Sequence, residues 1–201
     1  MRRIGILLYK HFDLIDAGGP YEVFLTASRL AIRDGEAPLY DVVLISAGGD
    51  DVEAFGGMTL TGLVAAEDAG DLDVLLVPGL VDLAAARADS RIAEAITALA
   101  ERSLLVTSVC TGAFLLGDAG LLQGRPATTH WEDVPDLGAH ESVREAVPGV
   151  RWVDDGDVVT SGGLTSGIHM SLHLVARDHG VEMAQRTARQ LDLDWSPTPE
   201  R

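Results

Sequence analysis

The sequence contains a single cysteine, Cys110, among its 201 residues. One cysteine excludes an intramolecular disulfide and a metal site built from cysteines alone. Two roles remain open for this thiol. It is either a buried and inert core residue, as most lone cysteines are, or a functional group.

Basic residues are also scarce. Lysine and arginine together number 15, against 31 aspartates and glutamates, which gives a formal net charge of −16 at pH 7. The acidic excess is spread along the chain without a block of like charge. Such a surface repels phosphate backbones, so we expect no nucleic-acid partner.

Long hydrophobic runs are missing as well. The longest apolar stretches have the length of a strand, and a strand-like run begins almost at the first residue. The sequence therefore predicts neither a membrane span nor a signal peptide, and we expect a cytoplasmic protein without a membrane partner. Hydrophobic residues still make up 47% of the chain. We expect one domain over residues 1–195 and a flexible tail over residues 196–201.

Strand-like and helix-like patterns alternate along the chain, which is typical of an α/β domain with a parallel sheet. Buried strands are predicted at residues 3–9, 40–47, 73–77 and 104–109, with an edge excursion at 55–63 and a hairpin at 152–160. Helices are predicted after Asp16, at 84–101, after Cys110, from about Ser166, and at 181–191.

Cys110 lies at the junction between an apolar run and a small-residue helical pattern that begins after Gly112. A strand, a sharp turn with one reactive residue and a helix together form a nucleophile elbow. Free N–H groups and the helix dipole stabilise an anion at such a turn, so we expect a functional thiol with a lowered pKa.

Open α/β sheets bind ligands at the carboxyl ends of their strands. The loops at Asp16, Gly79, Cys110 and Gly162-Gly163 are therefore expected to share one rim and to form a pocket. Asp16 has two possible roles there, as the N-cap of the next helix or as a chemical group. If it only caps, Asp16→Asn should preserve stability, because Asn caps about as well as Asp.

Six segments give the chain a recognisable pattern: residues 15–24, 77–79, 106–112, 120–124, 127–131 and 160–168. Over residues 3–191 the chain resembles the ThiJ/PfpI group of the class I glutamine-amidotransferase-like superfamily. Within that group it is most similar to isocyanide hydratases and to the related ligand-binding domain of AraC-type regulators. The resemblance implies a flavodoxin-like three-layer sandwich, in which helices cover both faces of a mostly parallel sheet.

The same resemblance implies roles for individual residues. Cys110 would be the nucleophile, with Asp16 as the acid beside it. Thr111 matches the hydratases, whereas PfpI-type peptidases carry a histidine at that position. Because a threonine hydroxyl does not shuttle protons at neutral pH, this difference weakens the protease interpretation. The backbone N–H groups of Leu80 and Thr111 would stabilise developing charge.

Substrate-binding roles are expected for Gly79, Leu80, His130, Gly163 and His169. Leu80 replaces a glycine that is common in the group, and His169 replaces an acidic residue. His130 either lies near Cys110 or is a structural histidine stacked near its neighbour Trp131. His169 and His173 have metal-ligand spacing, but no third ligand is evident, so no metal is expected.

Taken together, the sequence predicts a cofactor-free enzyme that hydrates a small isocyanide-like molecule to an N-substituted formamide. The alternatives are a PfpI-type amidase or protease-like hydrolase, and a small-molecule or redox sensor. Because the chain ends at Arg201 without room for a helix-turn-helix domain, direct control of transcription is not expected. A homodimer is expected from the resemblance alone.

Overall fold

The computed structural model describes residues 1–200. Its centre is a seven-stranded sheet in the order β10-β11-β7-β6-β1-β2-β5, in which every pair is parallel except β10 with β11. The strands are β1 (Arg2–Leu7), β2 (Tyr40–Ser46), β5 (Val64–Ala65), β6 (Leu72–Val77), β7 (Ser103–Val109), β10 (Trp152–Asp154) and β11 (Val158–Ser161).

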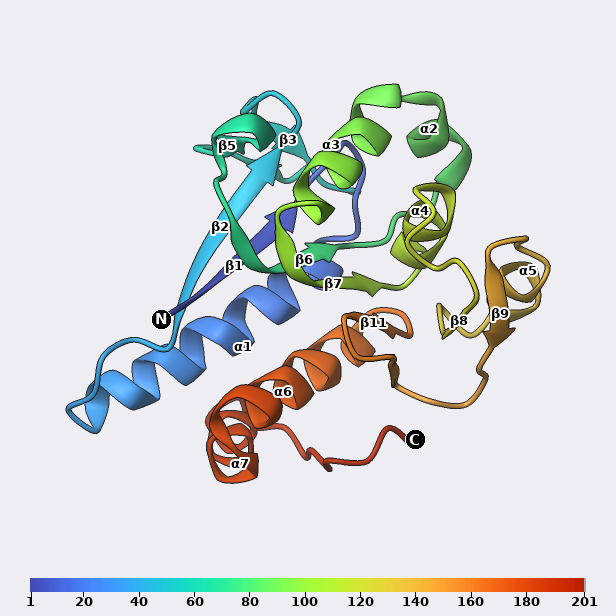
Figure 1. Cartoon of the computed structure of the whole chain (residues 1–201). Helices are drawn as coiled ribbons and strands as arrows, with labels where there is room; N and C mark the ends of the chain where they lie inside the picture. Colours follow the sequence, from blue (N-terminus) through green and yellow to red (C-terminus); the bar gives the residue numbers. More distant parts are fainter. Residues whose placement is uncertain (201) are drawn as a thin grey trace.

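Helices cover both faces of this sheet (Figure 1). One face carries α1 (Leu14–Arg33), α6 (Thr165–His179) and α7 (Val181–Gln190). The other carries α2 (Leu83–Ala88), α3 (Ser90–Ala100) and α4 (Gly112–Asp118). The predicted flavodoxin-like three-layer sandwich is confirmed.

Several short elements lie outside the central sheet. A two-stranded antiparallel pair joins β3 (Val52–Glu53) to β4 (Thr59–Leu60). Only β4 falls within the edge excursion predicted at residues 55–63. A parallel pair joins β8 (Arg125–Ala127) to β9 (Val143–Ala146), and α5 (Val134–Gly138) packs against β9. A single 3₁₀ turn, Ala66–Asp68, precedes β6.

The helix predicted over residues 84–101 is wrong in one respect, because it is two helices. The carboxylate of Asp82 accepts a hydrogen bond from the N–H of Ala85, which starts α2. The carboxylate of Asp89 does the same for the N–H of Arg91 at the start of α3. Aspartate favours such caps over a helix interior, so a second helix begins where a continuous one was predicted.

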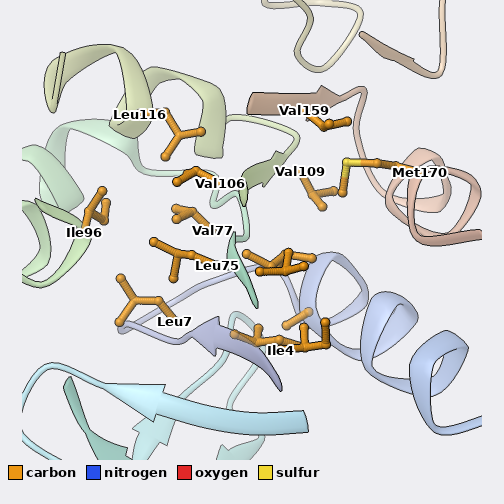
Figure 2. Packing of buried hydrophobic residues seen from close by; sticks show 14 of the residues in the cluster. Ile4, Leu7, Leu75, Val77, Ile96, Val106, Val109, Leu116, Val159 and Met170 are labelled. Atoms are coloured by element: carbon orange, nitrogen blue, oxygen red, sulfur yellow. The ribbon is translucent and has the colours of Figure 1, made fainter. Parts of the chain in front are cut away.

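The core consists of apolar side chains on both faces of the sheet, as expected for parallel strands covered on both sides. Figure 2 shows Val109 and Val159 beside Met170 of α6 on one side of the sheet. Ile96 and Leu116 lie on the other side, where α3 and α4 pack. The strands that lead into the predicted rim are therefore held from both faces.

The end of the chain runs alongside the segment before β10. Glu200 forms an isolated bridge with Val150, and the N–H of Arg151 donates to the carbonyl of Pro199 at 2.7 Å. The flexible tail predicted at 196–201 stays a prediction, and Arg201 lies outside the described residues. Among residues 1–200, no helix is long and apolar enough to span a membrane.

Leu75 and Leu104 allow the core to be tested with a matched pair of substitutions. Leu75 on β6 is fully buried, whereas Leu104 on the neighbouring strand β7 is 73% exposed. Leu75→Ala is expected to lower the free energy of unfolding by about 2–5 kcal/mol, because it leaves a cavity in a packed core. Leu104→Ala should change it by no more than about 0.5 kcal/mol in the same urea titration. Equal losses would contradict this core.

Candidate functional site

The turn after β7 places Cys110 in a strained conformation at the carboxyl edge of the sheet. Its φ is 57°, in the left-handed region that non-glycine residues rarely adopt. The turn is tight enough that a Cβ at Gly112 would lie 2.7 Å from the carbonyl oxygen of Pro78. Strand, strained cysteine and helix follow in the predicted order, and the nucleophile elbow is therefore present in the structure.

Asp16 is fully buried in the first turn of α1, and its carboxyl group joins two other loops. One oxygen, Oδ2, accepts the N–H of Gly79 at 3.0 Å. The other, Oδ1, accepts the N–H of Leu164 at 3.0 Å. The N-cap position belongs to Asp13, so the capping role considered for Asp16 is wrong.

The carboxyl of Asp16 and the thiol of Cys110 both have raised pKa values, and burial is the main cause for each. Burial raises the pKa of Asp16 to about 7, although hydrogen bonds from Gly79, Leu164 and Cys110 act in the opposite direction. Burial also raises the pKa of the Cys110 thiol well above its usual range, and the charge of Asp16 raises it further. The prediction of a lowered thiol pKa is therefore wrong, because burial and a neighbouring carboxylate outweigh the N–H of Thr111.

The Gly79-Leu80 loop closes one side of the pair formed by Asp16 and Cys110. A Cβ at Gly79 would lie 2.7 Å from the Cβ of Cys110 and 2.8 Å from Oδ2 of Asp16, so only glycine fits. The N–H of Leu80 donates to Oγ1 of Thr111 at 2.9 Å, and the same hydroxyl donates to the carbonyl of Leu80 at 2.7 Å. The Leu80 N–H and the Thr111 hydroxyl are therefore already hydrogen-bonded. This geometry does not favour the expected role of the Leu80 N–H, which was to stabilise a developing anion.

His130 and Gly163 close the opposite side. A Cβ at Gly163 would collide with the His130 ring and would lie 3.2 Å from Sγ of Cys110, so both side chains face this glycine. The ring centroid of His130 is also 5.7 Å from that of Trp131. His130 therefore lies near Cys110, and its ring is tilted by 43° against that of Trp131 rather than stacked on it. Its Nδ1 lies 3.5 Å from a carboxylate oxygen of Asp133.

His169 is placed differently. It is 8% exposed on α6, and burial together with the charge of Arg151 lowers its pKa to about 4. Its backbone carbonyl accepts the indole N–H of Trp195 at 3.1 Å. Within residues 1–200, no hydrogen bond joins His169 to Asp16 or Cys110. His173, four residues on, forms an ion pair with Asp154 at 2.6 Å.

Two residues near the pair were missed by the sequence reasoning. The hydroxyl of Tyr9 donates to the carbonyl of Pro78, at the start of the Gly79 loop. One carboxylate oxygen of Asp13 lies within 4.8 Å of both a carboxylate oxygen of Asp16 and Sγ of Cys110. A signal available in the sequence was the place of Asp13 three residues before Asp16, at the junction between the first strand and the helix.

A cavity of about 400 Å³ adjoins the elbow at Thr111. Apolar, acidic and basic side chains line it, including Val81, Phe114, Asp133, Arg87 and His140. It lies on the side of α4 and α5, next to the reactive pair rather than around it. The arrangement thus brings together a buried thiol, a carboxyl with a raised pKa and an adjacent cavity.

The raised pKa of Asp16 predicts a specific pH dependence of stability. An acid with a pKa of about 7 in the folded chain and an ordinary value of 3.8 stabilises the fold at low pH, and this contribution is lost as pH rises toward 7. The difference in unfolding free energy between wild type and Asp16→Asn should therefore fall between pH 4 and 7 in urea titrations. His169 titrates in both proteins, so its contribution cancels in this free-energy difference.

The same substitution is no longer expected to be neutral for stability at low pH. Both Asp16 oxygens accept backbone N–H groups, whereas an asparagine amide has one accepting oxygen. The lost bond should cost about 1–3 kcal/mol at pH 4. A free-energy difference that stays constant from pH 4 to 7 would show that Asp16 does not titrate as described.

Comparison with known proteins agrees with this geometry. The profile of the DJ-1/PfpI family matches residues 2–177. Isonitrile hydratase of Pseudomonas putida is 36% identical over 200 residues, covering 98% of this chain and 80% of that protein. The HTH-type transcriptional regulator GlxA of Rhizobium meliloti is 30% identical over 207 residues, covering 97% of this chain and 57% of the regulator.

Solved structures agree at the level of the fold. A ThiJ/PfpI family protein from Pseudomonas syringae superposes with a TM-score of 0.83 at 26% identity, covering 98% of this chain and 76% of that chain. Family profile, sequence relatives and fold all extend over most of the described residues, elbow included. The chain belongs to the DJ-1/PfpI family.

Proposed function

We propose that this protein adds water to the terminal carbon of a small organic isocyanide and releases an N-substituted formamide, without a cofactor. The observation that carries the proposal is the buried pair of Asp16 and Cys110, which holds a proton beside a sulfur nucleophile. The terminal carbon of an isocyanide has to accept both a nucleophile and a proton. A thiol and an acid at one point supply both.

The first step forms a covalent intermediate. Sulfur of Cys110 bonds to the terminal carbon, and the former thiol proton reaches the same carbon through the carboxyl of Asp16. The R–N≡C group thereby becomes a thioimidate, R–N=CH–S. Binding to the N–H groups of Gly79 and Leu164 keeps the Asp16 carboxyl fixed during this transfer.

Water completes the cycle. Its oxygen adds to the thioimidate carbon while Asp16 takes one of its protons and passes it to the nitrogen. The carbon–sulfur bond then breaks as the C=O bond forms, and the second proton of the water returns to the sulfur. The formamide R–NH–CHO leaves, and the thiol and carboxyl are restored.

Two features favour hydration over peptide hydrolysis. The residue after the nucleophile is Thr111, whose hydroxyl is engaged by Leu80, so no imidazole at that position serves a leaving amine. The 36% identity to isonitrile hydratase of Pseudomonas putida supports the same choice. A general amidase of the PfpI type is therefore the less favoured enzyme.

A small-molecule sensor remains the second candidate function. Its specific support is the likeness to the regulator GlxA, of which this chain covers 57%. A sensor would use the rim around Cys110 to bind its ligand without turnover. Binding of an isocyanide without formamide formation would favour it over the enzyme.

An activity screen tests the hydratase proposal. Wild type is incubated with n-butyl isocyanide, and the formamide is measured by mass spectrometry. Cys110→Ser and Asp16→Asn should each lose at least ~100-fold in kcat, because one removes the nucleophile and the other the titratable proton. Asp71→Asn, a matched loss of one exposed carboxylate at the amino end of β6, should retain activity. Equal turnover by wild type and Cys110→Ser would refute the mechanism.

We also infer a homodimer formed at the rim. Exposed apolar side chains lie around the site at Ile15 in the first turn of α1 and at Val81, Trp131 and Leu164 in three loops. Light scattering at micromolar concentration should give twice the chain mass, and Trp131→Ala should weaken the association. Leu104→Ala, an equally exposed apolar position at the amino end of β7, is the control. A monomeric wild type would contradict the inference.

A further inference from the structure

Asp13 occupies an N-cap position without capping. It precedes α1 with extended backbone angles, but its side chain makes no capping hydrogen bond. Within residues 1–200, no hydrogen bond to its carboxylate is found. Its own N–H donates to the carbonyl of Gly79 at 2.9 Å, which fixes the residue between α1 and the Gly79 loop. A carboxylate without a hydrogen-bond donor at a helix start is unusual, because capping would stabilise both groups.

The carboxylate is instead directed to the reactive pair. An oxygen of Asp13, an oxygen of Asp16 and Sγ of Cys110 all lie within 4.8 Å of one another. Asp16 has no exposed surface, whereas Asp13 is partly exposed. Asp13 is thus the member of this cluster that reaches both solvent and the buried carboxyl.

We propose that Asp13 exchanges protons between solvent and the buried pair of Asp16 and Cys110. In turnover, this role rests on the proposed hydration, in which Asp16 must act first as an acid and then as a base. Asp13 would take a proton from Asp16 and release it to solvent, or carry one in the opposite direction. The hydration cycle itself conserves protons, so this exchange sets whether Asp16 carries a proton at the start of each turnover, and no further reactant is needed.

The other polar groups around the pair have partners of their own. The Tyr9 hydroxyl donates to Pro78, and the Thr111 hydroxyl is engaged by Leu80.

Nδ1 of His130 lies near carboxylate oxygens of Asp133 and Glu132. Burial raises the pKa of Asp13, and the charge of His130 lowers it. The raised proton affinity supports a group that can accept and release protons beside Asp16.

The first experiment needs no substrate. Cys110 is alkylated with iodoacetamide across a range of pH, in wild type and in Asp13→Asn. Removal of a negative charge this close to sulfur should lower the midpoint of the rate profile by about one pH unit or more. Asp71→Asn removes the same charge from an exposed position just before β6, at the opposite end of the sheet, and should leave the midpoint unchanged. An unchanged midpoint in Asp13→Asn would overturn the proposal, whether or not the protein hydrates isocyanides.

The second experiment separates proton exchange from a structural role. With n-butyl isocyanide, Asp13→Ala should lower kcat about 10-fold or more with little change in KM, and added formate should restore part of the loss. Asp13→Glu should retain most of kcat. A loss that neither formate nor glutamate restores would overturn the proposal. If wild type forms no formamide, the hydratase proposal fails, and the alkylation midpoint alone decides the role of Asp13.

Discussion

The rest of the site depends on one buried carboxyl group, that of Asp16. Its two oxygens bind backbone N–H groups that lie 63 and 148 positions away in the sequence. Loops that follow β6 and β11 are thereby fixed against the first turn of α1 and against Cys110. Burial of an ionised carboxyl is unfavourable, and two N–H donors offset only part of that cost. The result is a carboxyl with a pKa of about 7, which holds and releases a proton near neutrality.

A second contact in the site, between Thr111 and Leu80, is made by neutral groups. The hydroxyl of Thr111 exchanges two hydrogen bonds with the backbone of Leu80, so the elbow and the loop after β6 are joined by neutral groups. The neutral contact links the two loops, and the charged one positions the Asp16 carboxyl beside Cys110. The catalytic role that the resemblance implied for Thr111 stays a prediction.

Local patterns explain why so much of the fold was predictable. The apolar runs that precede Gly79 and Cys110 are buried strands, and the glycines after them mark turns, so the α/β class and the shared rim follow from short segments. The elbow was predictable for the same reason, since a strand, one cysteine and a Thr-Gly turn are adjacent in sequence.

What escaped prediction depends on residues that are distant in sequence. The place of Asp16 inside the first turn follows from a helix that begins at Leu14, and its partners come from loops that no local pattern identifies. The direction of the Cys110 pKa shift was wrong because it is a balance of burial, a nearby carboxylate and one N–H group. The carboxylate of Asp13 was missed because an aspartate at a helix start is ordinarily a cap.

Glycine surrounds Cys110 at positions 79, 112 and 163, and at each of them a Cβ would strike a neighbouring atom. On these three sides the site is therefore bounded by main-chain atoms, and a side chain at any of these positions would displace its neighbours. Variation between related chains is thus left to side chains further out, such as Val81 and Phe114, which line the adjacent cavity. Such a division would let the reactive centre persist unchanged while related chains diverge in what they recognise.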